Sequence, residues 1–322
     1  MSGALTSSEL IRSIKRRAMI PSDQNTFTDE DFLEMLNEEM QYFGIPHLLR
    51  THEEYLLVFD DIVLDGSDRY EIPYRAIGNK LREISLVTVS GTNGETTDQI
   101  LELSRISVED LPDFNSYSSS RYSQAFYVES NHIVLLGEVP TSGTVLRMHY
   151  YLRPNAFVVD KSAGVISSID TVGGVITVTT FPTGFSSSPD MDFIKHRSPN
   201  TIMGRDITPL SVDSNTRTIT FTPGDIPTNL IVGDYLNVAQ ETIVPQLPVE
   251  LHAILAQRVA VAALEALGDQ EGLAAAQRRL DAMEKSSNDI IDNRVEGAPE
   301  KISKRHGTLR DALSGSKRRG GI

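Results

Sequence analysis

The stretch that most limits the possible folds lies near the C-terminus, between Pro248 and Arg294. Proline suits the first position of a helix, because the N–H that it lacks would have no partner there. Gly268 can end this helix in a left-handed conformation, and Asp269 can cap the next one. The spacing therefore predicts two helices folded back on each other. The apolar residues that recur at steps of three and four on the first helix are Leu251, Ile254, Leu255, Val259, Ala262, Ala263 and Ala266.

Helices are also predicted in the first sixty residues. The first spans residues 6–18 and the third spans residues 47–59. The second begins after Thr28, with Asp31 as the partner in a variant of the capping box. Helices at both ends of the chain are expected to pack into one bundle.

The pattern changes to short strands from Tyr70 onwards. Leu81–Val89 alternates between apolar and polar residues, and the turn signal Gly91–Gly94 predicts a hairpin. Two further hairpins are predicted between residues 156 and 238. The segment 186–205 has no clear period and is predicted to be a long loop.

These patterns predict an α+β protein with a helical bundle built from both chain ends. The bundle is assigned to residues 1–65 and 240–297. A large antiparallel β insertion of two units, 66–153 and 154–239, separates the two halves of the bundle. An extended basic tail, residues 298–322, follows it.

The charge of the chain is unevenly distributed. The net charge is −14 over 322 residues. From Lys301 to Ile322 there are seven lysines and arginines and a single acid, Asp311, so this tail carries +6 and leaves −20 for the rest of the chain. An acidic body binds nucleic acid poorly, whereas the basic tail can contact an acidic surface or phosphates.

The tail allows three interpretations: a solvated end, a segment that orders when it docks on a partner, and a DNA-binding segment. Apolar residues interspersed with the cations favour docking, and DNA binding lacks aromatic residues that would stack on bases. The candidate binding residues are Lys301, Ile302, Lys304, Arg305, Leu309, Arg310, Leu313, Lys317, Arg318 and Arg319.

The residues do not favour metal, cofactor or catalytic chemistry. The chain has no cysteine, which excludes disulfides and thiolate metal sites. Its histidines lack a ligand spacing, and Asp190 and Asp192 are interpreted as solvated loop carboxylates rather than cation ligands. No G-x-S-x-G motif is present. We therefore predict neither catalytic residues, nor a metal, nor a cofactor, and no enzymatic activity. Without an apolar run of about 18 residues, no membrane contact is predicted.

Several segments together resemble the head-to-tail adaptor (connector) proteins of tailed bacteriophages. They read IKRRAMIP, TDEDFLEMLNEEM, HEEYLLVF, HYYLRP, VGDYLNVAQETIVPQLPVELHAILAQRVAVAALEALGD and IDNRVEGAPEKI. The resemblance covers most of the chain and is strongest over residues 230–300. The second β unit, about residues 156–238, departs from the small members of that family.

The resemblance implies a structural protein of the virion neck, made in the host cytoplasm. It implies a ring, usually of twelve copies, whose C-terminal tail reaches the portal protein and whose β parts face the tail tube or nozzle proteins. DNA would pass through the lumen without specific binding. Leu264 and Leu267 lie off the main apolar face of their helix and are the residues expected at a contact between subunits.

Two other functions remain open from the sequence. One is a virion-associated tail or baseplate hydrolase, with a cleft lined by the segment 112–124 or 186–205 and with Asp190 and Asp192 as test positions. The other is a nucleic-acid-binding protein that depends on the basic tail.

Overall fold

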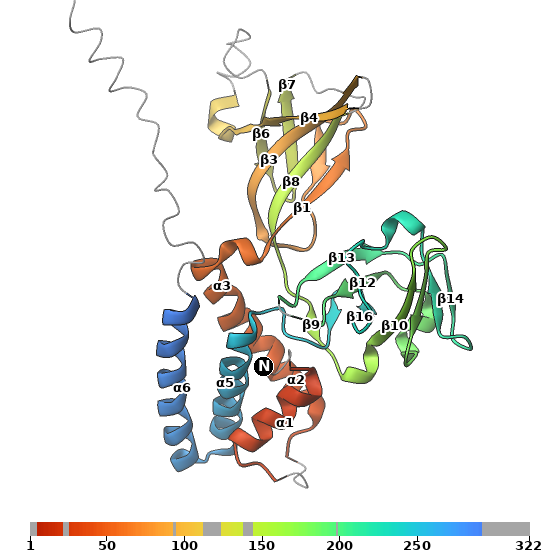
Figure 1. Ribbon diagram of the computed structural model, residues 1–322. Coiled ribbons are helices and arrows are strands. Elements are labelled where there is room, and N and C mark those ends of the chain that lie inside the picture. Colours follow the sequence, from red (N-terminus) through yellow and green to blue (C-terminus); the bar gives the residue numbers. More distant parts are fainter. Residues whose placement is uncertain are drawn as a thin grey trace, which may run out of the picture.

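The computed structural model describes residues 5–21, 26–92, 95–111, 124–137, 144–197 and 199–291. The helices lie together at one end of the molecule (Figure 1). The strands form two groups beyond them, which we call the first β unit (β1 to β8) and the second β unit (β10 to β16).

The helical group combines segments from the two ends of the chain. Its α-helices are α1 (Ser7–Arg17), α2 (Asp29–Glu39), α3 (Ile45–Thr51), α5 (Val249–Leu267) and α6 (Gln270–Ile291). A π-helical turn, Met40–Gly44, joins α2 to α3. Helices α1 and α2 pack on α5, and α6 packs on the other side of α5 (Figure 1). Their shared core includes the fully buried Leu10, Ile14, Phe32, Leu36 and Leu255.

The ends of these helices follow from local chemistry. Thr6 caps α1 through a capping box with Glu9. At the end of α5, Gly268 has a φ of 72°, a left-handed conformation that glycine adopts without steric cost. Asp269 Oδ1 accepts a hydrogen bond from the N–H of Gly272 at 3.0 Å, so the predicted cap of the last helix is confirmed.

The first β unit consists of two packed sheets. One has the antiparallel order β1-β8-β3-β4, and the other has the order β2-β7-β6-β5. The predicted hairpin is confirmed, because β3 pairs with β4 as far as Thr92 and Glu95. The core between the sheets includes Leu86, Ile133 and Met148. The strands are β1 (Leu57–Val63), β2 (Arg69–Glu71), β3 (Ala76–Thr92), β4 (Glu95–Glu102), β5 (Ser104–Arg105), β6 (Gln124–Glu129), β7 (His132–Gly137) and β8 (Thr144–Leu152).

The second β unit is an antiparallel sheet of seven strands in the order β13-β12-β16-β10-β11-β15-β14. Its core holds three fully buried phenylalanines, Phe185, Phe193 and Phe221. A short parallel pair, β9 with β17, lies beside it. The strands are β9 (Ala156–Phe157), β10 (Gly164–Asp170), β11 (Val175–Val178), β12 (Met191–Ile194), β13 (Ile202–Ile207), β14 (Ser211–Asp213), β15 (Thr218–Thr220), β16 (Tyr235–Val238) and β17 (Glu241–Thr242).

The predicted fold class is wrong. The described residues are organised mainly by four sheets, and the helices form the smaller part of the chain. A helical bundle with a β insertion therefore does not describe the fold. The strands that the sequence did not predict include β1, which begins inside a predicted helix, and β12, whose four residues are all buried and therefore show no alternation.

Two local errors contributed to this result. The helix predicted over residues 47–59 ends at Thr51, and β1 already begins at Leu57. The loop predicted over residues 186–205 contains β12 and most of β13. All four residues of β12 are buried, and a short apolar run of this kind has no periodicity to read.

Thr28 offers a direct test of the helix start of α2. Its hydroxyl accepts from the N–H of Asp31 at 3.2 Å, and the Asp31 carboxylate accepts from the N–H of Thr28 at 2.6 Å. Thr28→Ala is expected to lower the free energy of unfolding by about 1 kcal/mol, measured by urea titration. Thr28→Ser retains the acceptor and is the matched control. Equal stability of the alanine and serine variants would contradict the cap.

Among the described residues, no helix is both long and apolar enough to cross a membrane.

Candidate functional site

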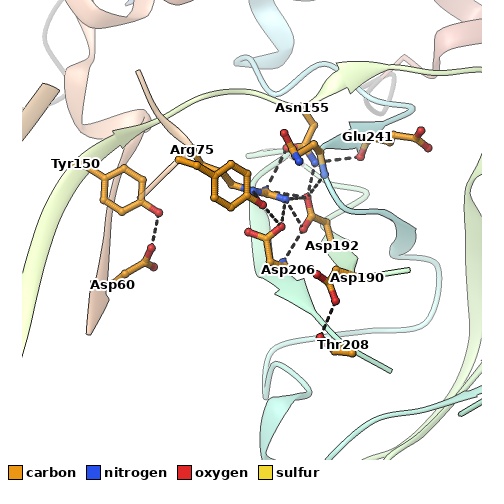
Figure 2. Close-up of polar contacts among 11 residues, drawn as sticks. Asp60, Arg75, Tyr150, Asn155, Asp190, Asp192, Asp206, Thr208 and Glu241 are labelled. Carbon is orange, nitrogen blue, oxygen red and sulfur yellow. Dashed lines mark hydrogen bonds and ion pairs between the residues drawn. The ribbon is translucent and has the colours of Figure 1, made fainter. Parts of the chain in front are cut away.

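A buried polar junction lies where the two β units meet the connection between them (Figure 2). Arg75 stands in the turn between β2 and β3 of the first β unit, and Asp192 lies in β12 of the second. Asn155 belongs to the link between β8 and β9. Arg75 is 3% exposed and Asp192 is fully buried, so both charges are removed from water.

The hydrogen bonds of this junction satisfy the buried carboxylate. Both terminal nitrogens of Arg75 donate to Asp192 at 2.9 Å. Asn155 Nδ2 donates to the same carboxylate at 2.6 Å, and the backbone N–H groups of Asp206 and Gln240 donate at 2.9 and 3.0 Å. Two terminal guanidinium nitrogens and three further donors bond to this carboxylate. These hydrogen bonds offset the loss of hydration that makes a buried charge costly.

Asp206 brings a second carboxylate to Arg75. It accepts from Arg75 Nη2 at 2.6 Å and from the Tyr74 hydroxyl at 2.6 Å. Burial acts to lower the pKa of Arg75, but its hydrogen bonds and ion pair with Asp192 outweigh burial and raise that pKa above its ordinary value. The guanidinium of Arg75 therefore stays charged where it meets the two carboxylates.

A second contact links the β units beside the first. Tyr150, buried in β8, donates its hydroxyl proton to Asp60 of β1 at 2.7 Å. Asp60 also pairs with Arg205 of β13, which donates to the carbonyl of Phe59 at 3.0 Å as well. Burial, followed by the hydrogen bond to Asp60, raises the pKa of Tyr150 above its ordinary value. The two β units are thus joined through two separate arginines.

The helical group reaches the same junction from the other side. The N–H of Asn155 donates to Gln246 Oε1 at 2.6 Å. The N–H of Phe157 donates to Asn37 of α2 at 2.7 Å. A cleft of about 530 Å³ lies between these parts; its lining residues include Asn37, Gln41, Tyr74, Arg153, Asn155 and Gln240. The junction therefore fixes all three parts of the chain relative to one another.

A buried histidine ties the start of the chain to α5. His252 is 1% exposed, and its Nδ1 lies 3.4 Å from the N–H of Leu5. Its Nε2 lies 3.2 Å from the carbonyl oxygen of Leu247. This arrangement suits a neutral ring with its proton on Nε2. Burial lowers the pKa of His252 to about 4.

The polar groups of these sites are engaged by neighbouring side chains and backbone groups. The Asp192 carboxylate accepts from Arg75, Asn155 and two backbone N–H groups, so its lone pairs are occupied. An Asp–His pair elsewhere joins Asp234 to His196 Nδ1 at 2.7 Å, but Nε2 of this ring accepts from Arg197 Nε at 3.0 Å. A general base would need that nitrogen. Among the described residues, no three metal-ligating side chains come together.

Of the predicted binding and interface residues, the structure describes only Leu264 and Leu267. The ten tail residues, Lys301 to Arg319, lie outside the described part of the chain. Leu264 is 4% exposed and lies in the core of its own chain, where Gly272 of α6 approaches it closely. Leu267, the last residue of α5, is 41% exposed. The contact of Leu264 and Leu267 with another subunit stays a prediction.

The reading of Asp192 as a solvated loop carboxylate is wrong, and Arg75 was not foreseen as its partner. A signal was present, because an acid between Met191 and Phe193 is unusual in an apolar run. The sequence could not name the partner, since 117 residues separate the arginine from the aspartate. Asp190 is exposed, and its carboxylate accepts from the Thr208 hydroxyl at 2.6 Å.

No family model matches the chain, and no match was found among curated proteins.

Proposed function

We propose that this protein is a structural subunit of a head-to-tail adaptor in the neck of a tailed bacteriophage. Copies of the chain assemble into a ring of about twelve subunits between the portal and the tail, as the resemblance of its sequence segments implies. In this role the basic C-terminal tail docks on the portal, and the β units serve as the platform for tail proteins. The lumen extends the DNA channel.

The observation that carries the proposal is the buried junction around Arg75 and Asp192. A connector transmits position between two large assemblies, so its parts must hold a constant relative orientation. Three groups with separate cores would otherwise move about their links, as parts joined by small interfaces do. A fully buried, multiply hydrogen-bonded ion pair resists such motion, because separating its partners leaves a charge unpaired in a nonpolar environment.

The distribution of charge supports the same role. The body of the chain is strongly acidic, and an acidic wall repels phosphates instead of retaining them. DNA can then pass through a ring of such subunits without adhering. The basic tail has the opposite sign and is suited to docking, and many copies acting together offset the entropy lost when each tail becomes ordered.

Deletion of residues 299–322 tests the docking role. Portal binding is expected to fall by at least about 100-fold, because each subunit loses its tail and the gain from multivalency is lost with it. Surface plasmon resonance on immobilised portal rings measures the effect. The melting temperature of the truncated protein is expected to equal that of the full chain.

Two matched variants separate the contributions within the tail. One variant replaces Lys317, Arg318 and Arg319 by glutamine, which removes their charge. The other replaces Leu309 and Leu313 by alanine, which removes apolar contacts. If the tail docks in a groove, the variant with alanine in place of Leu309 and Leu313 is expected to bind the portal more weakly than the full chain. Unchanged binding of the truncated protein would refute the docking role of the tail.

A further inference from the structure

Two helices of the helical group carry exposed rows of opposite charge. On α2, Glu30, Glu34 and Glu38 follow at steps of four and all three are exposed. On α1, Arg12 and Arg16 are also four residues apart and exposed. In each helix the buried residues occupy the opposite face, so both rows point away from the core.

The acidic row has no cationic partner among the residues that the structure describes. The ion pairs of α2 use other acids, since Asp29 pairs with Lys15 and Glu39 pairs with Arg258. Like charges at steps of four destabilise an isolated helix. Tyr42, in the π-helical turn that follows α2, is 80% exposed and adds a large aromatic ring beyond Glu38. We call Glu30, Glu34, Glu38 and Tyr42 the acidic row.

The basic row is likewise without a carboxylate partner in the described ranges. Glu9, the acid nearest to it on α1, accepts from the N–H of Thr6 at 3.1 Å and belongs to the cap. Arg17 lies alongside and bonds to Gln257 of α5 at 2.8 Å. Burial, and then the charges of Arg279 and Arg16, lower the pKa of Arg17.

Met19 adds an exposed apolar side chain to the basic row. It is 89% exposed and has a φ of 54°, a left-handed conformation that disfavours residues with a Cβ. The N–H of Ile20 bonds to the carbonyl of Lys15 at 2.8 Å, which is the helix ending where glycine usually occupies this position. Folding alone therefore does not favour methionine here. We call Arg12, Arg16 and Met19 the basic row.

We infer that the acidic row of one copy of this chain docks on the basic row of a second copy. The inference rests on the proposed function in one respect, namely that repeated contacts build a ring. The contact between two copies follows from the two rows themselves. Each copy has one row of each sign, so a second copy supplies the complement that each row lacks. Tyrosine, methionine and arginine are also the residues enriched at protein interfaces. A contact between two different surfaces closes into a ring or continues as a filament.

Nucleic acid is the competing partner for the basic row. Phosphates would pair with Arg12 and Arg16 equally well. They would leave the acidic row and Tyr42 without a role. A second copy accounts for both rows at once, which is why we favour it.

A charge exchange tests the inference. Variant one carries Glu34→Lys and Glu38→Lys, and variant two carries Arg12→Glu and Arg16→Glu. Either variant by itself places like charges on both sides of the contact, so its self-association is expected to weaken by about 100-fold. An equimolar mixture restores both contacts and is expected to assemble like the wild type. Native mass spectrometry and sedimentation velocity at low and physiological salt measure assembly, and circular dichroism checks that each variant folds.

The control carries Glu109→Lys and Asp225→Lys, two exposed acids of the β units, and has the same net charge as variant one. It is expected to assemble normally. Assembly of variants one and two by themselves, or failure of their mixture to assemble, overturns the inference. Wild-type assembly that stops at a dimer overturns the inference, because a contact between two different surfaces leaves one row of each sign free and continues to a ring or filament. Loss of duplex DNA binding in variant two with unchanged assembly overturns the inference in favour of nucleic acid.

Met19→Gly provides an independent readout. Glycine suits the left-handed conformation, so the melting temperature is not expected to fall. Self-association is expected to weaken by about 10-fold, because an interface side chain is lost. A merely structural methionine would give the opposite pattern, with a lower melting temperature and unchanged association, and that result overturns the role of Met19.

Discussion

Replacing Arg75 by methionine is expected to lower the free energy of unfolding by about 3–5 kcal/mol. The change leaves Asp192 fully buried without its cation, and the three remaining donors do not replace a full charge. Urea titration measures the loss. Limited proteolysis around Asn155 gives a second readout, because a released junction exposes the link between the β units.

The matched control removes an exposed ion pair. Arg69 and Glu129 lie 2.6 Å apart, but their side chains are 53% and 49% exposed. Arg69→Met is therefore expected to cost no more than about 1 kcal/mol. Similar losses for Arg75→Met and Arg69→Met would contradict the junction as the element that locks the chain.

A double variant identifies the cause of the loss. Arg75→Met with Asp192→Asn removes both charges and retains one oxygen, which can accept from Asn155 Nδ2 and the backbone N–H of Gln240, the two donors that share Oδ2 in the wild type. It is expected to recover most of the stability lost in Arg75→Met, because the unpaired buried charge is gone. Failure to recover would assign the loss to packing of the arginine side chain instead.

Acid is expected to destabilise the protein through His252. The pKa of this ring falls from about 6.5 in the unfolded chain to about 4 in the folded one, chiefly through burial. Below pH 6.5 the unfolded state takes up the proton first, so stability declines as the pH falls and the penalty is nearly complete at pH 4. The contribution reaches about 3 kcal/mol at that pH. Above pH 7 it vanishes.

His252→Gln removes the titrating group while keeping one donor and one acceptor for Leu247 and Leu5. Between pH 7 and pH 4, the free energy of unfolding of this variant is expected to fall by about 3 kcal/mol less than that of the wild type. His132→Gln, at a half-buried position in β7, is the control and is expected to follow the wild type. Parallel curves for His252→Gln and the wild type would refute the assignment.

These two predictions concern the same structural property. Arg75 joins the β units, and His252 ties the start of the chain to α5 beside the link that carries Gln246. Both groups connect segments that are far apart in the sequence. Each such link limits the relative motion of the parts that it joins, which is the property that the proposed adaptor role requires.

Some features of this protein follow from the sequence alone. The helix pair from Pro248 onwards was predictable because helix periodicity, a left-handed glycine at Gly268 and a capping aspartate at Asp269 are all local. The start of α2 at Thr28 and the hairpin from β3 to β4 were predictable for the same reason. Local hydrogen bonds and turn geometry need only neighbouring residues.

Tertiary structure alone decided the balance of the fold and the junction. Strand β12 gave no periodic signal, because all four of its residues are buried, and β13 is half-buried along its whole length without alternation. Asp192 became a buried charge only because folding brings Arg75 to it from another sheet. Leu264, which lies off the main face of its helix, was covered once α6 folded over it. A sequence specifies the neighbours of a residue along the chain, but its partners across space depend on how the sheets and helices pack.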